Sequence, residues 1–132
     1  MIKANELRIG NYISPVSKNA GIHIPCYSVK YKVGAIDKFG VVKIIDPSKY
    51  QNITLKYGEY CGITITHEWL ERFGFENRGN NLFVNGKIEL RHYRGRNDVL
   101  VRGINVSYNY IHQLQNLYFA LTGEELEYNH NI

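Results

Sequence analysis

The chain has 132 residues, of which 44% are hydrophobic and 21% charged, and its formal net charge is +4. This length and composition are typical of one folded globular domain, which excludes a disordered or fibrous chain. The sequence has no uninterrupted apolar stretch of the roughly 18–20 residues that a membrane helix needs, and its polar first residues do not resemble a signal peptide. We therefore expect a single cytoplasmic domain over residues 1–132, with no membrane association.

Short extended segments dominate the first 62 residues. Residues 7–13 alternate apolar and polar side chains around a Gly-Asn pair, whereas residues 14–25 lack periodicity and are expected to form a loop. Further strands are expected at residues 26–37, 41–45, 53–57 and 60–65, with a tight turn at 38–40 and a break at Pro47. Several brief strands joined by turns predict a small SH3-like curved sheet or barrel over residues 1–62.

Residues 66–75 have the pattern of a short, capped helix. Thr66 is suited to cap the first turn, and Gly74 accepts the left-handed backbone conformation that ends a helix. Trp69, Leu70 and Phe73 share one face of this helix, so we expect all three side chains to be buried.

A hairpin and a further strand follow this helix. Residues 82–84 and 87–90 flank Asn85 and Gly86, and this order is typical of a β-hairpin. Residues 98–106 return to strand-like alternation. Three strands are therefore expected to form a meander after the helix.

The last predicted element is an amphipathic helix over residues 109–121. Its apolar stripe consists of Ile111, Leu114, Leu117, Tyr118 and Leu121. Gly123 supplies the stop, and residues 124–132 form an acidic, polar tail. The chain is thus expected to adopt an α+β fold, with the SH3-like subregion at 1–62 and an α+β subregion at 63–132 that the C-terminal helix closes.

The expected core draws on both subregions. It joins alternating apolar residues of the strands to the apolar faces of the two helices. Its members are Leu7, Ile9, Val33, Ile36, Val42, Ile44, Ile65, Trp69, Leu70, Phe73, Leu114, Leu117 and Leu121.

The cysteines and histidines give little support to metal or redox chemistry. Cys26 and Cys61 are too few for a disulfide framework, and no two histidines lie three or four residues apart, as a helical zinc pair requires. We therefore expect no metal and no cofactor, and we expect the histidines at surface or boundary positions. They are His23, His67, His92, His112 and His130.

One segment predicts a contact surface. Arginine side chains bind phosphate through two nitrogen atoms, and an interleaved tyrosine stacks on a base. The candidate residues for ligand or nucleic-acid binding are Arg91, Tyr93, Arg94, Arg96 and Arg102. The alternative interpretation is a solvated connection whose arginines pair with Glu89 and Asp98.

Three blocks of the sequence carry a resemblance to a known family. They are ELRIGN at residues 6–11, ITHEWLERFGF at 65–75 and HQLQNLYFALTGEEL at 112–126. In this order they resemble a family of small uncharacterised proteins encoded by Bacteroidetes bacteria and by their phages and mobile elements. The resemblance implies a bacterial or phage cytoplasmic protein, and it brings no catalytic residues with it.

Familiar catalytic patterns such as GxxxxGK[ST], GxSxG and HExxH are absent, which favours binding over catalysis. We expect a non-enzymatic intracellular binding module of a phage or mobile element that engages a host protein or a nucleic acid. Two alternatives stay open. One is a sponge that sequesters a small signalling nucleotide in a pocket lined by tyrosine and arginine, and the other is an enzyme with Cys26 or Cys61 as its nucleophile.

Overall fold

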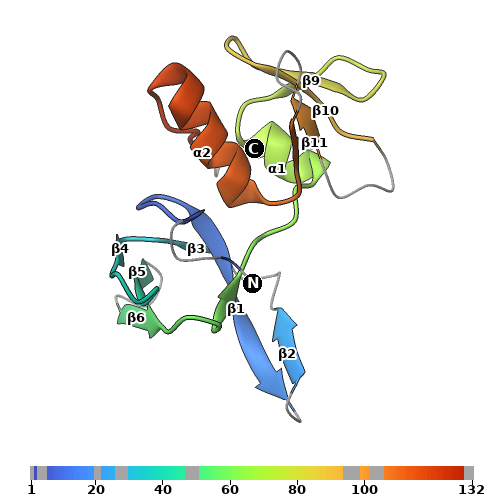
Figure 1. Ribbon diagram of the computed structural model, residues 1–132. Helices are drawn as coiled ribbons and strands as arrows, with labels where there is room; N and C mark the ends of the chain where they lie inside the picture. Colours follow the sequence, from blue (N-terminus) through green and yellow to red (C-terminus); the bar gives the residue numbers. More distant parts are fainter. Residues whose placement is uncertain are drawn as a thin grey trace. The chain divides into compact units, whose positions relative to one another are not determined.

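The computed structural model describes residues 2, 6–19, 22–25, 30–46, 51–93, 99–101 and 106–129. Within these residues, short strands form three antiparallel sheets and are accompanied by two α-helices, so the α+β fold class is confirmed (Figure 1). No helix in this part of the chain is long and apolar enough to cross a membrane. The chain divides into two compact units, Met1–Ile63 and Thr64–Ile132, which are described separately.

The first unit contains a sheet centred on β1 (Tyr12–Asn19). Its neighbours, all antiparallel to it, are β2 (Ile22–Pro25), β3 (Tyr31–Lys32) and β7 (Tyr60–Cys61). The prediction of a loop over residues 14–25 is wrong, because β1 and β2 form a hairpin in which Asn19 lies opposite Ile22. Four antiparallel residue pairs, from Val16 opposite Pro25 to Asn19 opposite Ile22, form this hairpin, and Pro25 is tolerated because β2 lies at the edge of the sheet.

A three-stranded sheet completes the first unit. Its strands are β4 (Ala35–Ile36), β5 (Val42–Asp46) and β6 (Gln51–Leu55), in the order β4-β5-β6. The single strand predicted over residues 26–37 is interrupted after β3, because consecutive residues bond to different sheets. Val33 donates its N–H to the carbonyl of Asn11 beside β1 (2.8 Å), and Gly34 donates to the carbonyl of Lys43 in β5 (2.9 Å).

The core of the first unit is one apolar cluster. Its buried members are Ile2, Leu7, Ile13, Val33, Val42, Ile44 and Tyr60, and Tyr31, Ile36, Ile53 and Leu55 pack against them. The prediction of Ile9 in the core is wrong: its side chain is 62% exposed because a turn, closed by the N–H of Asn11 and the carbonyl of Arg8, places it at an outer corner. The two sheets do not close into a barrel within the described residues, so the SH3-like barrel is not confirmed.

The second unit contains a five-stranded antiparallel meander. Its strands are β8 (Glu76–Asn77), β9 (Leu82–Val84), β10 (Glu89–Arg91), β11 (Val99–Val101) and β12 (Val106–Tyr108), and each pairs with its neighbours in sequence. Two more strands are present than the sequence predicted. Phe83, Leu90 and Val101 lie opposite one another on one face, and all three are buried, so this face of the sheet is covered.

Two helices, both predicted, accompany this sheet (Figure 1). They are α1 (His67–Arg72) and α2 (Ile111–Thr122). The hydroxyl of Thr66 accepts a hydrogen bond from the N–H of Trp69 at 3.3 Å, and Gly74 and Gly123 adopt positive φ at the two C-termini, as the sequence predicted. The ring of His67 lies against the ring of Phe83, with centroids 4.8 Å apart, so the first turn of α1 packs on the buried face of the sheet.

The predicted core positions on the helices are confirmed in part. Leu70, Phe73, Ile65 and Leu114 are buried, whereas Trp69 and Leu117 are half-buried. Leu121 is 48% exposed, so its assignment to the core is wrong. It lies in the last turn of α2, and its side chain lines an open concavity rather than the interior.

The polar C-terminal tail packs against α1. Leu126 is buried, and the ring of Tyr128 meets the ring of Trp69 edge-on at a centroid distance of 4.9 Å. The guanidinium of Arg72 lies 5.6 Å from the centre of the Tyr128 ring, and the N–H of Asn129 donates to the carbonyl of Arg72 at 2.8 Å. Leu126 and Tyr128 therefore anchor the C-terminal tail, whose acidic composition gave no sign of a packing role.

Candidate functional site

The predicted arginine segment is only partly described. Arg94, Arg96 and Arg102 lie outside the described residues, so the contact surface expected from this segment stays a prediction. At the end of β10, Nη1 of Arg91 donates to the carbonyl of Asn80 at 2.9 Å, and this bond ties β10 to the connection between β8 and β9. Tyr93 is 37% exposed. The structure thus gives Arg91 a structural role and leaves the ring of Tyr93 accessible.

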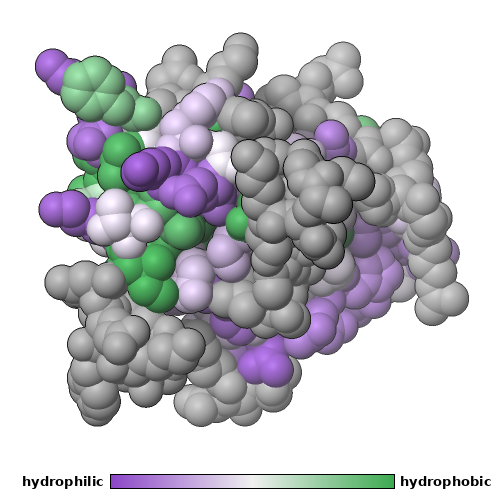
Figure 2. Space-filling model, turned by 90° about the horizontal axis from the view of Figure 1, so that it is seen from below, coloured by the Kyte–Doolittle hydropathy of each residue, from purple (hydrophilic) through white to green (hydrophobic). Residues whose placement is uncertain are grey.

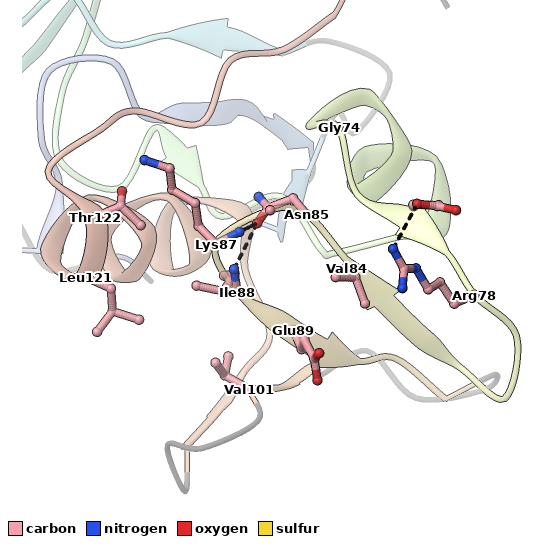
Figure 3. A pocket seen from close by; sticks show the side chains of 12 residues that line it. Gly74, Arg78, Val84, Asn85, Lys87, Ile88, Glu89, Val101, Leu121 and Thr122 are labelled. Atoms are coloured by element: carbon pink, nitrogen blue, oxygen red, sulfur yellow. Dashed lines mark hydrogen bonds and ion pairs between the residues drawn. The ribbon is translucent and has the colours of Figure 1, made fainter.

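An open concavity of about 1050 Å³ lies elsewhere in the second unit (Figure 3). β8, the β9–β10 hairpin, β11 and the C-terminal end of α2 enclose it. Its lining residues are Gly74, Glu76, Arg78, Val84, Asn85, Gly86, Lys87, Ile88, Glu89, Val101, Leu121 and Thr122. Sequence patterns assigned these residues to a hairpin, a strand and a helix, and no local signal indicates that they meet around one hollow.

The β9–β10 hairpin is held rigid by Asn85. Its side-chain oxygen accepts hydrogen bonds from the N–H groups of Lys87 (3.0 Å) and Ile88 (2.9 Å), and its own N–H donates to the carbonyl of Ile88. The Asn-Gly hairpin is therefore confirmed, although Val84 pairs with Glu89 and the loop between them has four residues. This fixed loop sets the directions of Lys87 and Ile88 at the edge of the concavity.

The apolar part of the lining is exposed to different degrees. Val101 is buried, Val84 and Ile88 are half-buried, and Leu121 is 48% exposed. Figure 3 shows Ile88, Val101 and Leu121 on one side of the concavity and Arg78 on the opposite side. The accessible Leu121 therefore gives the lining an apolar part that remains open to solvent.

The charged part of the lining is balanced, with two acidic and two basic side chains. Arg78 and Glu76 form an ion pair at 3.5 Å on one side. On the other side, Lys87 pairs with Glu124, which follows α2, at 2.9 Å, and the hydrogen bond with this carboxylate raises the pKa of Lys87. Together with Glu89, these groups form a polar rim without a dominant sign of charge.

The lining does not match the pocket expected of a nucleotide sponge. That hypothesis requires tyrosine and arginine, but the described lining contains no tyrosine, and its arginine, Arg78, is paired with a carboxylate. The four charged residues cancel, so phosphate groups gain no net electrostatic attraction here. The sponge therefore stays a prediction that this concavity does not support.

Cys61 does not have the environment of an activated nucleophile. It is half-buried, and burial raises the pKa of its thiol, which keeps the sulfur protonated near neutral pH. Cys26 lies outside the described residues. Within the part of the chain that the structure describes, no three His, Cys, Asp or Glu side chains form a cluster that could hold a metal ion.

Two histidines are more deeply placed than the sequence predicted. His112 is fully buried and stacks on the ring of Tyr110, with centroids 5.8 Å apart, and Gln115 is buried beside it on α2. The prediction of a surface or boundary position for His112 is wrong, because α2 buries a face wider than its apolar stripe. His92 is also buried, and its ring meets that of His67 at 4.7 Å, with His67 at a boundary position as expected.

Comparisons of the chain with protein-family models, with curated proteins and with solved structures found no match.

Proposed function

We propose that the chain is a non-enzymatic binding module of a phage or mobile element, which acts in the host cytoplasm and docks a host protein in the concavity of its second unit. The observation that carries this proposal is the exposed Leu121, which lines the concavity together with Val84, Ile88 and four charged residues of balanced sign. Apolar centres surrounded by polar rims are typical of protein–protein interfaces.

The balance of charge favours a protein over a nucleic acid as the occupant. Nucleic-acid affinity depends on lysine and arginine side chains that replace counterions at phosphates. In this concavity Arg78 and Lys87 each face a carboxylate already, at 3.5 and 2.9 Å. A protein surface with both signs of charge is electrostatically compatible with these paired charges, whereas a polyanion gains no net attraction from them.

The elements around the concavity are already ordered, which also favours it as a binding surface. Asn85 fixes the hairpin loop, and the ion pair between Lys87 and Glu124 links that loop to the end of α2. A binding surface that is already ordered loses less conformational entropy when its partner arrives. The concavity is therefore built from elements that need little rearrangement to bind.

The test uses two exposed apolar residues of the same helix. Leu121 and Phe119 are 48% and 40% exposed, and two residues apart on a helix they point in nearly opposite directions, about 200° around the axis. Wild type, Leu121→Asp and Phe119→Asp proteins are immobilised and exposed to host lysate. A host protein retained by wild type is then purified and titrated against all three.

The proposal predicts that Leu121→Asp weakens the affinity for this purified partner on the order of tenfold or more, as expected when a charge enters an apolar interface centre. Phe119→Asp is expected to bind like wild type. Equal losses for both variants, or equal binding by all three proteins, would show that the concavity is not the docking surface.

A further inference from the structure

Two neighbouring turns of the first unit each hold an aromatic ring in solvent. We propose that these turns form a second binding surface, separate from the concavity, on which the bases of a single-stranded nucleic acid stack against Phe39 and Tyr57 while lysines contact the phosphates. Phe39 is 70% exposed, the highest value among the large hydrophobic residues described, and Tyr57 is 48% exposed. In the coloured part of Figure 2, hydrophobic and hydrophilic groups lie side by side at the surface.

The first turn connects β4 and β5, where the sequence predicted a tight turn. The carboxylate of Asp37 accepts hydrogen bonds from the N–H groups of Phe39 (2.8 Å) and Val41 (3.1 Å). The backbone of Asp37 also bonds to Val41 and Gly40, and Gly40 adopts a φ of 82° that favours glycine. The turn is therefore ordered by its own backbone, and the exposure of Phe39 is a fixed feature of it.

The second turn connects β6 and β7 and is built in the same way. The carboxylate of Glu59 accepts from the N–H of Lys56 at 2.7 Å, and the N–H of Glu59 donates to the carbonyl of Lys56 at 2.9 Å. Gly58 has a φ of 89°. Tyr57 is held between these residues and points its ring into solvent.

A buried hydrogen bond joins the two turns. The hydroxyl of Tyr60, directly after the second turn, donates to the carbonyl of Gly40 in the first at 2.7 Å. Burial raises the pKa of Tyr60, and the nearby Tyr57 and Asp37, one from each turn, raise it further. Phe39 and Tyr57 are thus presented from one connected support.

The charge of the first unit suits a polyanion. Residues 1–63 contain nine Lys and Arg against four Asp and Glu, a formal charge of +5, whereas residues 64–132 contain seven against eight. Lys38 lies with its ammonium 5.1 Å from the centre of the Phe39 ring, and Lys56 belongs to the second turn. Lys32 in β3 and Lys43 in β5 are also exposed.

Stacking explains why rings rather than aliphatic side chains are presented. Every base has a flat face that packs on an aromatic ring, and proteins that bind single strands combine such rings with basic side chains. The two carboxylates near the rings, Asp37 and Glu59, bond to backbone N–H groups, so both have a role in ordering the turns.

The test is fluorescence anisotropy with the full chain and fluorescein-labelled 20-nucleotide oligo(dT), oligo(rU) and a 20-base-pair duplex. We expect the single strands to bind more tightly than the duplex. Phe39→Ala and Tyr57→Ala should each weaken single-strand binding by roughly 5- to 150-fold, the loss associated with one base–aromatic stack. Phe39→Leu should lose as much single-strand affinity as Phe39→Ala, because leucine keeps the apolar character but has no flat face.

Two variants serve as matched controls. Phe119→Ala removes an exposed aromatic ring from the second unit and is expected to bind oligonucleotides like wild type. Leu121→Asp should also bind them normally, so loss of the protein partner and loss of nucleic acid can be told apart. Circular dichroism and thermal melting confirm that each variant is folded.

Three outcomes would overturn the proposal. The first is that no oligonucleotide binds. The second is that wild type and the Phe39 and Tyr57 variants bind alike, which would indicate attraction by lysines alone. The third is that Phe39→Leu binds like wild type, which would indicate an apolar surface for a protein partner.

Discussion

The two units of this chain expose apolar groups in different ways. The first unit exposes two aromatic rings, Phe39 and Tyr57, one on each of two turns. The formal charge of this unit is +5. The second unit keeps Leu121, Val84 and Ile88 in a hollow with balanced charges. Protruding rings with excess positive charge suit flat, anionic ligands, whereas a charge-balanced hollow suits a protein surface. On this difference rest our two proposals, a protein-docking surface in the second unit and a nucleic-acid surface in the first.

The largest expected effect compares a buried phenylalanine with an exposed one. Phe83 is fully buried in the meander of the second unit, so Phe83→Ala should lower the free energy of unfolding by about 3–5 kcal/mol. Phe39→Ala in the first unit should change it by less than about 0.5 kcal/mol. Chemical denaturation followed by circular dichroism measures both. A large loss for Phe39→Ala would mean that its ring packs and is not presented for binding.

The next effect concerns the tail that packs on α1. Tyr128→Ala removes an edge-on contact with Trp69 and a cation–π contact with Arg72, and should lower the free energy of unfolding by about 1–2 kcal/mol. Trp69 is the single tryptophan of the chain, so its fluorescence should shift to longer wavelength as the ring becomes wetter. An unchanged emission spectrum would contradict the packing of the tail.

A smaller effect concerns the bond between the two turns of the first unit. Tyr60→Phe removes the hydrogen bond to Gly40 and should lower the free energy of unfolding by about 1 kcal/mol at neutral pH. The folded-state pKa of Tyr60 is raised above its ordinary 10.0, chiefly by burial. The stabilisation is therefore complete below that ordinary value and is lost as pH rises through the folded-state pKa.

Urea unfolding of wild type and Tyr60→Phe at neutral pH and at about pH 11 measures this dependence. The difference between the two proteins should shrink in the alkaline series. A difference that stays constant or grows would show that the hydroxyl of Tyr60 is not the group that titrates.

The smallest expected effect concerns the reactivity of Cys61 rather than the stability of the fold. Because burial raises the pKa of Cys61, its thiol should react with iodoacetamide more slowly than an exposed cysteine near neutral pH. Mass spectrometry of the labelled peptide over a pH series follows the rate. Fast labelling of Cys61 at neutral pH would revive the hypothesis of a cysteine-dependent enzyme.

Local signals predicted the helix ends and the hairpin turn of the second unit, although two of its five strands were missed. The cap at Thr66, the glycine stops at Gly74 and Gly123 and the turn at Asn85 each act within a few residues, and all four are confirmed. Strands of this unit pair with their neighbours in sequence, so the order of elements along the chain also gives the order in the sheet.

Non-local pairing made the first unit harder to predict. β1 pairs with β7, whose residues are more than forty positions away, and with β2, which has only four residues and ends in a proline. The crossing between sheets at Val33 and Gly34 depends on carbonyl groups of Asn11 and Lys43. Such partners leave no trace in a local window of sequence.

The candidate site was also hard to predict, because its exposure and contacts depend on residues far apart in the sequence. Ile111 and Leu121 belong to one predicted apolar stripe, yet the first is fully buried and the second is 48% exposed, because periodicity does not show where the cover over a helix ends. The hydrogen bond from Arg91 to the carbonyl of Asn80 also has no local sequence signal, and the role of Arg91 as a ligand contact stays a prediction.

The most direct test of the docking role is site-specific photo-crosslinking in host cells. A photoreactive phenylalanine analogue is placed at Leu121 in one protein and at Phe119 in another, on opposite sides of α2. A discrete adduct with one host protein is predicted for position 121, with little or none for position 119. Equal adducts from both positions, or none from position 121, would contradict the account of the concavity as a protein-docking surface.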